Sequence, residues 1–445
     1  MVSFFASPWI PATALLLLAC AARLLSDSWL APSAFTALIW STFVWISMLA
    51  TDYPIYASAV WVVVLFVLVF QLGAFSGESV IGGRPGKMMR RDRADANNLT
   101  PNSTALLFSV VFAIVALAGA IYFVFWSFWR FDLPASPISL LALGNLWSVQ
   151  RYEYGELEPW PVRLTIMWVY PAALLGGIAS AASKSGRTKL WTLSSFLPAL
   201  LVAFVVAARA GVLMSLICWF SGYFGVKHWQ SNGTYPLFRR RLLLQLAALG
   251  VAAVVLFVFV DAMRQSKDAQ SFQLALDLPR LLKYSFGSLA AFSSWFHQYK
   301  ADRATFGAYT FGGIFDLLGI KQREIGLGLQ LMALPGGEET NIYTALRSLI
   351  EDFTLLGAVF VAFVASFVSG ILLSCPSRRI WTPILFASGY YAFILCSPLT
   401  SLFTYNGLVL AWLVAAIILR SHFKLAGGHV LKRLGQPPAA TIHLT

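Results

Sequence analysis

Long hydrophobic runs separated by short polar segments make up most of the chain. A run of about 20 apolar residues can cross the hydrocarbon core of a bilayer as a helix. The strands of a membrane barrel would instead alternate in polarity over segments of about ten residues, and these runs do not. The pattern predicts eleven membrane-spanning helices, at about residues 8–25, 29–50, 54–76, 105–129, 163–182, 190–207, 210–226, 243–260, 353–374, 381–396 and 403–419.

The composition agrees with this pattern. Hydrophobic residues make up 58% of the 445 residues and charged residues 11%, and the mean hydropathy is +0.73. Soluble domains carry about 25% charged residues, so a soluble globular protein is excluded. We therefore expect an all-α, polytopic membrane bundle, because a helix satisfies its own backbone hydrogen bonds within lipid.

One long polar stretch, residues 261–352, interrupts the spans. It separates a region of eight spans at 1–260 from three further spans at 353–420 and a polar tail at 421–445. The stretch mixes Arg, Lys, Asp, Glu and aromatic residues more densely than any other part of the chain. A membrane protein has little reason to keep so many such residues on one side of the bilayer unless something is bound or converted there. We expect the probable active site in this loop.

Two shorter apolar segments, 281–296 and 136–149, are predicted to form helices at the membrane surface or re-entering it. A true span over 281–296 would contain Lys283. It would also place the basic C-terminal segment on the side opposite the other basic loops, against the usual distribution of Lys and Arg.

Basic residues fix the expected orientation, because short loops rich in Lys and Arg stay in the cytoplasm. Eleven spans put all the basic segments on one side, with the N-terminus periplasmic and the C-terminus cytoplasmic. The net charge of +13 is mostly this bias, which suits anionic membrane lipids and requires no nucleic acid. The basic segments are 77–104, 183–189, 227–242, 378–379 and 420–433.

The segment that leads into the ninth span carries the clearest candidate site. Thr340 or Asn341 is predicted to cap a helix after the Gly336-Gly337 turn. Three side chains recur at intervals of four along that helix, namely Tyr343, Arg347 and Glu351, so they share one face, and Asp352 lies beside it.

Two interpretations of Arg347 remain open. An exposed ion pair with Glu351 would contribute only a few tenths of a kcal/mol. Alternatively, Arg347 binds an anion at the mouth of a lipid-exposed cavity. Arg209, between the sixth and seventh spans, raises the same choice. It is either a functional charge near the membrane, suited to bidentate contact with phosphate oxygens, or a guanidinium that reaches the headgroups.

The first part of the long loop adds further candidates. Arg264 stands near its start, and Arg280, Lys283 and Tyr284 share one helical face. His297 is the only histidine expected outside, so it is the sole imidazole available there as a base. Packing among neighbouring aromatic residues is the alternative for His297. Arg151, in loop 130–162, belongs to a smaller cluster that a surface loop explains more simply.

The sequence gives little support for a metal site or a nucleotide-binding site. The five histidines are scattered, and the sequence has no Cys-x-x-Cys pair and no phosphate-binding Gly-Lys-Ser/Thr loop. No Gly-x-Ser-x-Gly motif of a serine hydrolase occurs either. We therefore expect neither a metal nor another cofactor.

Several motifs resemble those of bacterial oligosaccharide repeat-unit polymerases, the O-antigen and exopolysaccharide polymerases of the Wzy type. The motifs are TNIYTALR at 340–347 followed by EDF at 351–353 and Gly357, then KYSFGS at 283–288, GAYTFG at 307–312, and Arg209 ahead of Leu213. The layout of many spans with one large late loop is also similar. The chain departs from the family in its odd span number, in Thr354 where Gly usually follows Asp-Phe, and in lacking Arg-rich loop repeats.

The resemblance implies a metal-independent glycosyltransferase of the bacterial inner membrane. Such an enzyme moves a growing glycan from undecaprenyl pyrophosphate to the free sugar end of another lipid-linked repeat unit, alongside a flippase and a chain-length regulator. Positive charge is needed where the diphosphate departs, which favours Arg209 and Arg347, then Arg280 and Arg264. Glu351, Asp352 or His297 would take the acceptor proton. A last group would bind sugars or phosphates, namely Tyr343, Asn341, Tyr284, Lys283 and Arg151.

Two alternatives remain open. An O-antigen ligase has a similar layout but hands the glycan to lipid A-core. A polysaccharide flippase or other transporter belongs to a different class, and it should show charges in mid-span and pseudo-symmetric halves. Most charges of this chain lie at span ends or in one outer loop, and the halves show no repeat, which argues against transport.

Overall fold

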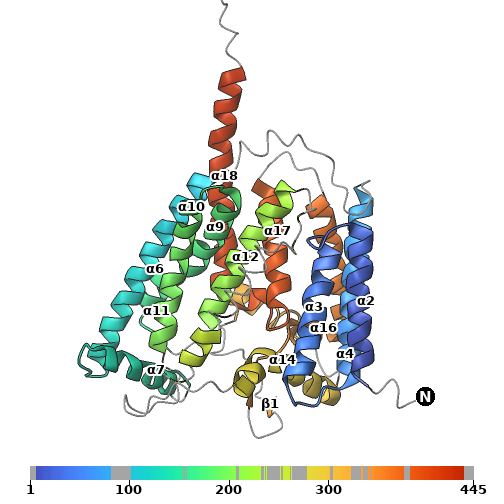
Figure 1. Cartoon of the computed structure of the whole chain (residues 1–445), viewed down its shortest axis with the longest axis horizontal. Coiled ribbons are helices and arrows are strands. Elements are labelled where there is room, and N and C mark those ends of the chain that lie inside the picture. Colours follow the sequence, from blue (N-terminus) through green and yellow to red (C-terminus); the bar gives the residue numbers. More distant parts are fainter. Residues whose placement is uncertain are drawn as a thin grey trace, which may run out of the picture.

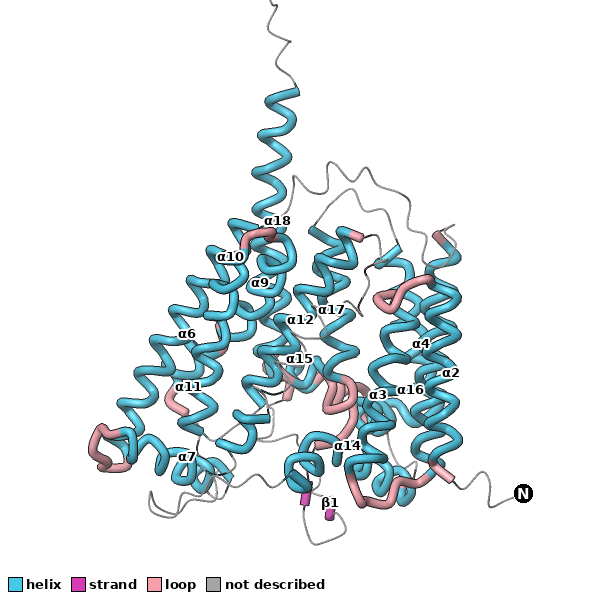
Figure 2. Tube along the Cα trace, viewed as in Figure 1, coloured by secondary structure: helices cyan, strands magenta, loops and turns pink. Residues whose placement is uncertain are grey.

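The structure is a computed structural model that describes residues 7–81, 102–152, 154, 156, 158–206, 210–231, 235, 237, 251, 254–260, 262, 278–300, 304–321, 332–333, 339–340, 342–374 and 381–434. Within this part the chain is a bundle of helices with one two-stranded antiparallel sheet (Figures 1 and 2). The helices of the first half are α2 (Trp9–Ser26), α3 (Pro32–Ala50), α4 (Ala57–Val80), α6 (Asn102–Arg130), α7 (Pro137–Tyr152), α8 (Trp160–Ile166), α9 (Val169–Ala182), α10 (Gly186–Thr192), η1 (Leu193–Phe196) and α11 (Leu197–Val206). The later elements are α12 (Ala210–Gln230), α14 (Leu278–Gln298), α15 (Gly312–Leu317), β1 (Met332–Ala333), β2 (Glu339–Thr340), α16 (Ala345–Ser374), α17 (Trp381–Cys396), η2 (Leu402–Thr404) and α18 (Asn406–Leu434).

Eight helical stretches in the described ranges are long and apolar enough to cross a membrane. Two shorter apolar helices, Thr382–Cys396 and Asn406–His422, coincide with the tenth and eleventh predicted spans. Of the predicted span 243–260, the structure describes only 251 and 254–260, which are helical. The chain is thus a polytopic membrane helix bundle, and the exact number of spans stays a prediction.

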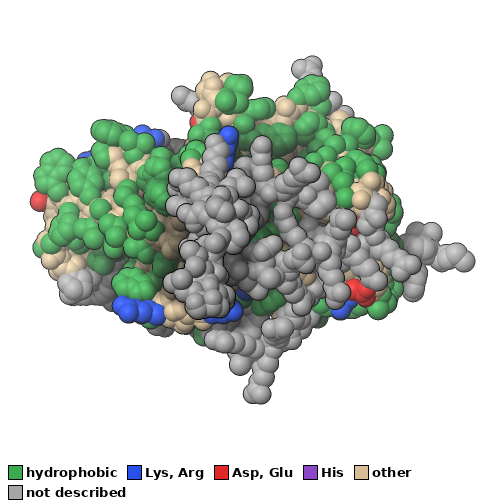
Figure 3. Space-filling model, turned by 90° about the horizontal axis from the view of Figure 1, so that it is seen from above, with side chains coloured by type: hydrophobic (Ala, Val, Ile, Leu, Met, Phe, Trp, Pro, Cys, Tyr) green, Lys and Arg blue, Asp and Glu red, His purple; other side chains and the backbone are tan. Residues whose placement is uncertain are grey.

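Large apolar side chains cover the sides of the bundle, where lipid would contact them. Leu17, Leu24, Phe125, Leu356 and Ile417 each expose more than half of their surface. Seen from above, the hydrophobic side chains dominate the periphery of the described part (Figure 3). A soluble protein rarely exposes apolar surface on this scale, so the distribution supports the membrane assignment.

The described parts of the polar segments lie at opposite ends of the bundle. The α9–α10 connection, with Lys184, and the start of α10, with Arg187, lie at the end from which α18 extends (Figure 1). At the other end lie α7, α14 and β1, all from the loops expected outside (Figures 1 and 2). This arrangement agrees with the prediction that segment 183–189 and the two longer loops lie on opposite sides of the bundle. The direction of the bundle in a membrane stays a prediction.

Close helix packing joins α4 to α16. The Cα atoms of Gly73 and Gly77 face α16 so closely that an added Cβ would lie 2.0 Å from the Ser366 hydroxyl and 2.1 Å from the Phe367 carbonyl oxygen, respectively. Gly370 faces the Ala74 backbone in the same way, at 2.3 Å. Small residues at such contacts let two helix backbones approach within a bilayer. The contact fixes α16 against the N-terminal helices.

A sharp change of backbone direction divides α16. Thr354 has φ 60° and ψ 172°, a conformation that is almost confined to glycine. We call residues 345–353 the α16 head. The expected helix start at Thr340 is wrong, because Thr340 lies in β2 and the helix begins at Ala345. The Ala345 N–H donates to the Ser397 carbonyl oxygen at 2.8 Å, which ties the start of the head to the end of α17.

Candidate functional site

A buried ion pair marks one side of the α16 head. Arg347 Nε donates to Glu351 Oε1 at 2.9 Å, one helical turn apart, as their spacing in the sequence predicts. The pair is not exposed as the simpler interpretation expected, because only 5% of the Arg347 side chain and 19% of the Glu351 side chain contact solvent. Within the described part of the chain, Arg347 Nη1 and Glu351 Oε2 are both buried without a standard hydrogen bond.

Aromatic rings enclose this pair. The Arg347 guanidinium carbon lies 3.8 Å from the centre of the Tyr343 ring and 5.2 Å from that of Trp295. The Trp295 side chain also contacts the Glu351 carboxylate. Tyr343 precedes the head, and Trp295 comes from α14, so the helix of the predicted outer loop packs directly onto the pair. Cation–π contacts of this kind strengthen as they lose water.

Burial raises the pKa of the Tyr343 hydroxyl, and the nearby Arg347 guanidinium opposes that shift. The phenol therefore stays protonated at neutral pH and keeps both a donor and an acceptor function. Tyr343 also packs with Tyr53, Ala290 and Ala291, so the α3–α4 connection and α14 help to position it.

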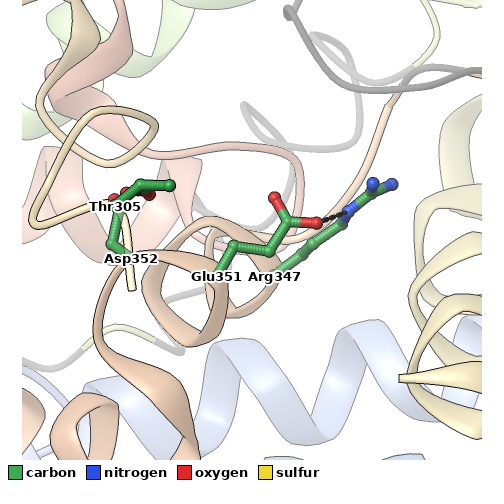
Figure 4. Close-up of polar contacts among 4 residues, drawn as sticks. All are labelled: Thr305, Arg347, Glu351 and Asp352. Atoms are coloured by element: carbon green, nitrogen blue, oxygen red, sulfur yellow. Dashed lines mark hydrogen bonds and ion pairs between the residues drawn. The ribbon is translucent and has the colours of Figure 1, made fainter. Parts of the chain in front are cut away.

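Asp352 points to the opposite side of the head (Figure 4). Its carboxylate accepts hydrogen bonds from the Thr305 hydroxyl, from the Tyr309 N–H at 3.1 Å and from the Thr310 N–H at 2.6 Å. Its backbone oxygen accepts from the Phe306 N–H at 3.0 Å. Asp352 is fully buried. These contacts favour a positioning role over the proton-accepting role that the sequence suggested.

The segment that Asp352 holds is an irregular turn, residues 304–311. Phe306 and Gly307 both have positive φ values, of 48° and 96°. Two further hydrogen bonds tie the turn to the chain after α17. The Thr310 carbonyl oxygen accepts from Ser401 at 2.9 Å, and that of Tyr309 accepts from Thr404 at 3.3 Å. The turn is thus bonded both to Asp352 of the head and to the segment after α17.

A mainly apolar pocket lies on this second side of the head. Thr310 contributes a buried hydroxyl that has no hydrogen bond within the described residues. The pocket lies between α3, α4, the head and the end of α17, and Arg347 is not part of its lining. It is lined by Thr36, Trp40, Phe66, Val67, Phe70, Thr310, Ala345, Leu346, Leu349, Phe393, Ile394, Ser397 and Ser401.

His297 does not form a described contact with the pair. Its ring is exposed and stacks on Tyr56, with 4.1 Å between the ring centres and 6° between their planes. This supports the packing alternative for His297. The positions of the other predicted site residues relative to the pair stay predictions. Arg209, Arg264 and Asn341 lie outside the described residues, and so do the side chains of Arg151, Arg280, Lys283 and Tyr284.

Sequence reasoning missed some of the site. The segment containing Thr310 was recognised from the sequence only as a motif. Nothing in the spacing of the residues indicated that Asp352 would accept a hydrogen bond from the Thr310 N–H. Nothing in the sequence indicated that Trp295 would contact Arg347. In the part of the chain that the structure describes, no three His, Cys, Asp or Glu residues gather into a potential metal site.

Comparisons with known proteins were made for the whole chain. No protein-family model, curated protein or solved structure matches it. The functional argument therefore rests on the residues of this chain and their geometry.

Proposed function

We propose that the protein is a polymerase that joins lipid-diphosphate-linked oligosaccharide repeat units at the outer face of the bacterial inner membrane. The donor glycan leaves its undecaprenyl pyrophosphate carrier and is transferred to the free sugar end of a second lipid-linked unit. Both substrates carry a lipid in the bilayer and sugars in the aqueous phase. A site at the boundary of a membrane bundle is suited to both.

The observation that carries the proposal is the incompletely bonded pair Arg347–Glu351 beneath two aromatic rings. A buried group without its hydrogen bond costs about 1–3 kcal/mol, so such groups are rarely kept without a reason. Aromatic rings beside a charged pair are well suited to sugars, because a ring can cover an apolar sugar face while the pair meets the hydroxyl groups. Only a small part of Glu351 is exposed, so water is largely kept from the pair.

The other assignments remain part of the proposal. Arg209, Arg264, Arg280 and Lys283 supply positive charge for the departing diphosphate. A further set binds the sugars and phosphates around the reacting groups, namely Arg151, Tyr284, Asn341 and Tyr343. The partners are lipid-linked oligosaccharide, membrane lipids, a flippase and a chain-length regulator.

The test is a strain that lacks the protein, complemented with the wild type or with Arg347→Ala. We expect the wild type to restore a ladder of long polysaccharide and Arg347→Ala to leave single repeat units, at equal protein level. Arg130→Ala is the matched control, because Arg130 forms an exposed ion pair with Glu156. Long ladders with Arg347→Ala would contradict the role of Arg347.

The same strain separates the two alternative functions. If loss of the protein leaves finished polymer on its lipid carrier, the protein is a ligase. If lipid-linked units stay on the cytoplasmic side, as a flux measurement with labelled units would detect, the protein is a transporter. Either result would contradict the polymerase proposal.

A further inference from the structure

The buried pair has two atoms of opposite kinds that form no hydrogen bond of standard geometry, although Trp295 interacts with the Glu351 carboxylate and Tyr343 with Arg347. Arg347 Nη1 can only donate a hydrogen bond, and an ionised Glu351 Oε2 can only accept one. Both belong to side chains on the same side of the α16 head, which the Nε–Oε1 contact of 2.9 Å joins, and the second Glu351 oxygen is turned away from the guanidinium (Figure 4). A ligand that satisfies both atoms must accept one hydrogen bond and donate another.

A diphosphate does not meet this requirement. Its oxygens at neutral pH are acceptors and carry negative charge, so contact with Arg347 would also bring them close to the Glu351 carboxylate. The repulsion from Glu351 opposes the attraction to Arg347, because the two charges are equal in size and adjacent. A pair that is already neutral is therefore a poor site for a leaving anion.

A sugar does meet it, because each hydroxyl group has one donor hydrogen and two acceptor lone pairs. We propose that Arg347 and Glu351 bind the acceptor sugar, Glu351 through the hydroxyl that attacks the donor and Arg347 through another oxygen of the same sugar, and that the diphosphate is bound by other cationic groups. This inference rests on the proposed function and assigns the pair to one of its two substrates. It replaces the expectation that Arg347 contacts the diphosphate.

The step that follows balances in atoms and charge. The acceptor oxygen forms a bond to the anomeric carbon of the donor sugar. The bond between that carbon and the diphosphate oxygen breaks, and its electron pair leaves with the lipid diphosphate. The hydroxyl proton passes to Glu351 Oε2, and Arg347 Nη1 orients the acceptor sugar by donating to another of its oxygens.

The aromatic rings determine how the acceptor reaches the pair. Arg347 is almost completely enclosed and Glu351 keeps 19% of its side chain exposed, but Glu351 Oε2 itself is buried, so the hydroxyl can reach it only when a covering side chain moves. Trp295 lies over the guanidinium and against the carboxylate, and its ring must shift for the sugar to bind. Once shifted, the indole can cover the sugar face beside the reacting hydroxyl.

The experiment uses the full-length protein in lipid nanodiscs, with a lipid-linked repeat unit as donor and a short-chain alkyl glycoside of the repeat unit as acceptor. Transfer is measured against acceptor concentration. Binding at the diphosphate site is measured separately, as inhibition by a polyprenyl diphosphate that carries no sugar. The variants are Glu351→Gln, which keeps the shape of the side chain, and Arg347→Lys, with Glu156→Gln as control.

We expect Glu351→Gln to lower kcat/KM for the acceptor by about 100-fold or more. The part of the pH dependence of transfer that reflects deprotonation of Glu351 should be lost in this variant. Inhibition by polyprenyl diphosphate should stay within about twofold of wild type, a difference of less than about 0.5 kcal/mol in binding free energy. Arg347→Lys should raise the acceptor KM, because Lys cannot reproduce the guanidinium geometry. Glu156→Gln should leave all three measurements unchanged.

A different outcome overturns the inference. If the pair contacts the diphosphate, Glu351→Gln removes a repelling charge and strengthens inhibition about tenfold, and Arg347→Lys weakens it. If Glu351→Gln keeps the wild-type rate and pH profile, Glu351 does not accept the proton. Failure of the wild type to join any units contradicts the proposed function, and this assignment of the pair fails with it.

Discussion

Asp352 accepts a hydrogen bond from the Thr310 N–H at 2.6 Å, and the two residues are 42 positions apart in the chain. This bond lies on one side of the α16 head, and the neighbouring Glu351 faces the other side (Figure 4). Consecutive carboxylates therefore have separate tasks. Asp352 fixes the turn at 304–311 to the head, and Glu351 stays available at the candidate site.

Asp352→Ala should lower the stability of the protein. The substitution removes the acceptor for the buried N–H groups of Tyr309 and Thr310, and each unsatisfied group costs about 1–3 kcal/mol. We expect the free energy of unfolding in detergent to fall by about 2–5 kcal/mol. Asp352→Asn keeps one acceptor oxygen and should lose less.

The matched control is Asp27→Asn, because Asp27 is exposed at the end of α2. It should leave the unfolding midpoint unchanged. Equal midpoints for Asp352→Ala and the wild type would show that the hydrogen bonds of Asp352 do not stabilise the protein. The positioning role would then have to be abandoned.

Thr354→Gly should stabilise the protein. Thr354 has φ 60° and ψ 172°, and a non-glycine residue in this region is strained by about 1–3 kcal/mol. Glycine adopts the same conformation without a Cβ clash. Part of this gain is offset, because glycine raises the conformational entropy of the unfolded state. We expect a net gain of about 1 kcal/mol in the free energy of unfolding. Leu355→Gly, one residue into the second part of α16, should instead destabilise by more than about 1 kcal/mol, because it lowers helix propensity and also removes a side chain that packs against the core.

Hydrophobic periodicity was sufficient to place most of the bundle. The helix α2, for example, covers Trp9–Ser26 where the pattern predicted about 8–25. The reason is that a span must be helical and about 20 residues long whatever its partners are. The same local logic predicted that Arg347 and Glu351 share one helical face and left an ion pair as one of two interpretations, and the structure has the two side chains paired.

Contacts between distant segments could not be predicted from the sequence pattern. The helix was expected to start near Thr340, but the chain there forms β2, and Ala345 is held by the Ser397 carbonyl oxygen. Likewise, Asp352 was placed beside Glu351 without a sign of its partners in the turn at 304–311. Such contacts depend on tertiary packing, which overrides local signals such as helix caps and turn residues.

Removing both members of the buried pair should cost less stability than removing one. Arg347→Leu leaves an uncompensated buried carboxylate and should destabilise by about 3–5 kcal/mol. The double variant Arg347→Leu, Glu351→Leu buries no charge and should recover most of that loss. Under the proposed function it should nevertheless be inactive.

Chemical unfolding of the three proteins in detergent gives the comparison, and polymer ladders give the activity. Arg130→Leu and its double variant with Glu156→Leu serve as controls, because that pair is exposed and should contribute no more than about 1 kcal/mol. An active double variant would mean that the Arg347–Glu351 pair has only a structural role.

Gly77→Ala should weaken the packing of α4 on α16. The added Cβ would lie 2.1 Å from the Phe367 carbonyl oxygen, which is backbone and cannot move aside as a flexible side chain can. Overpacking of this kind costs about 1–3 kcal/mol, and α16 carries the candidate site at its head. We therefore expect a lower unfolding midpoint and less folded protein in the membrane. Gly211→Ala, where nothing lies within 4 Å of the added Cβ, should be neutral or slightly stabilising. Equal behaviour of the two variants in a thermal unfolding assay would contradict the close approach of the helices.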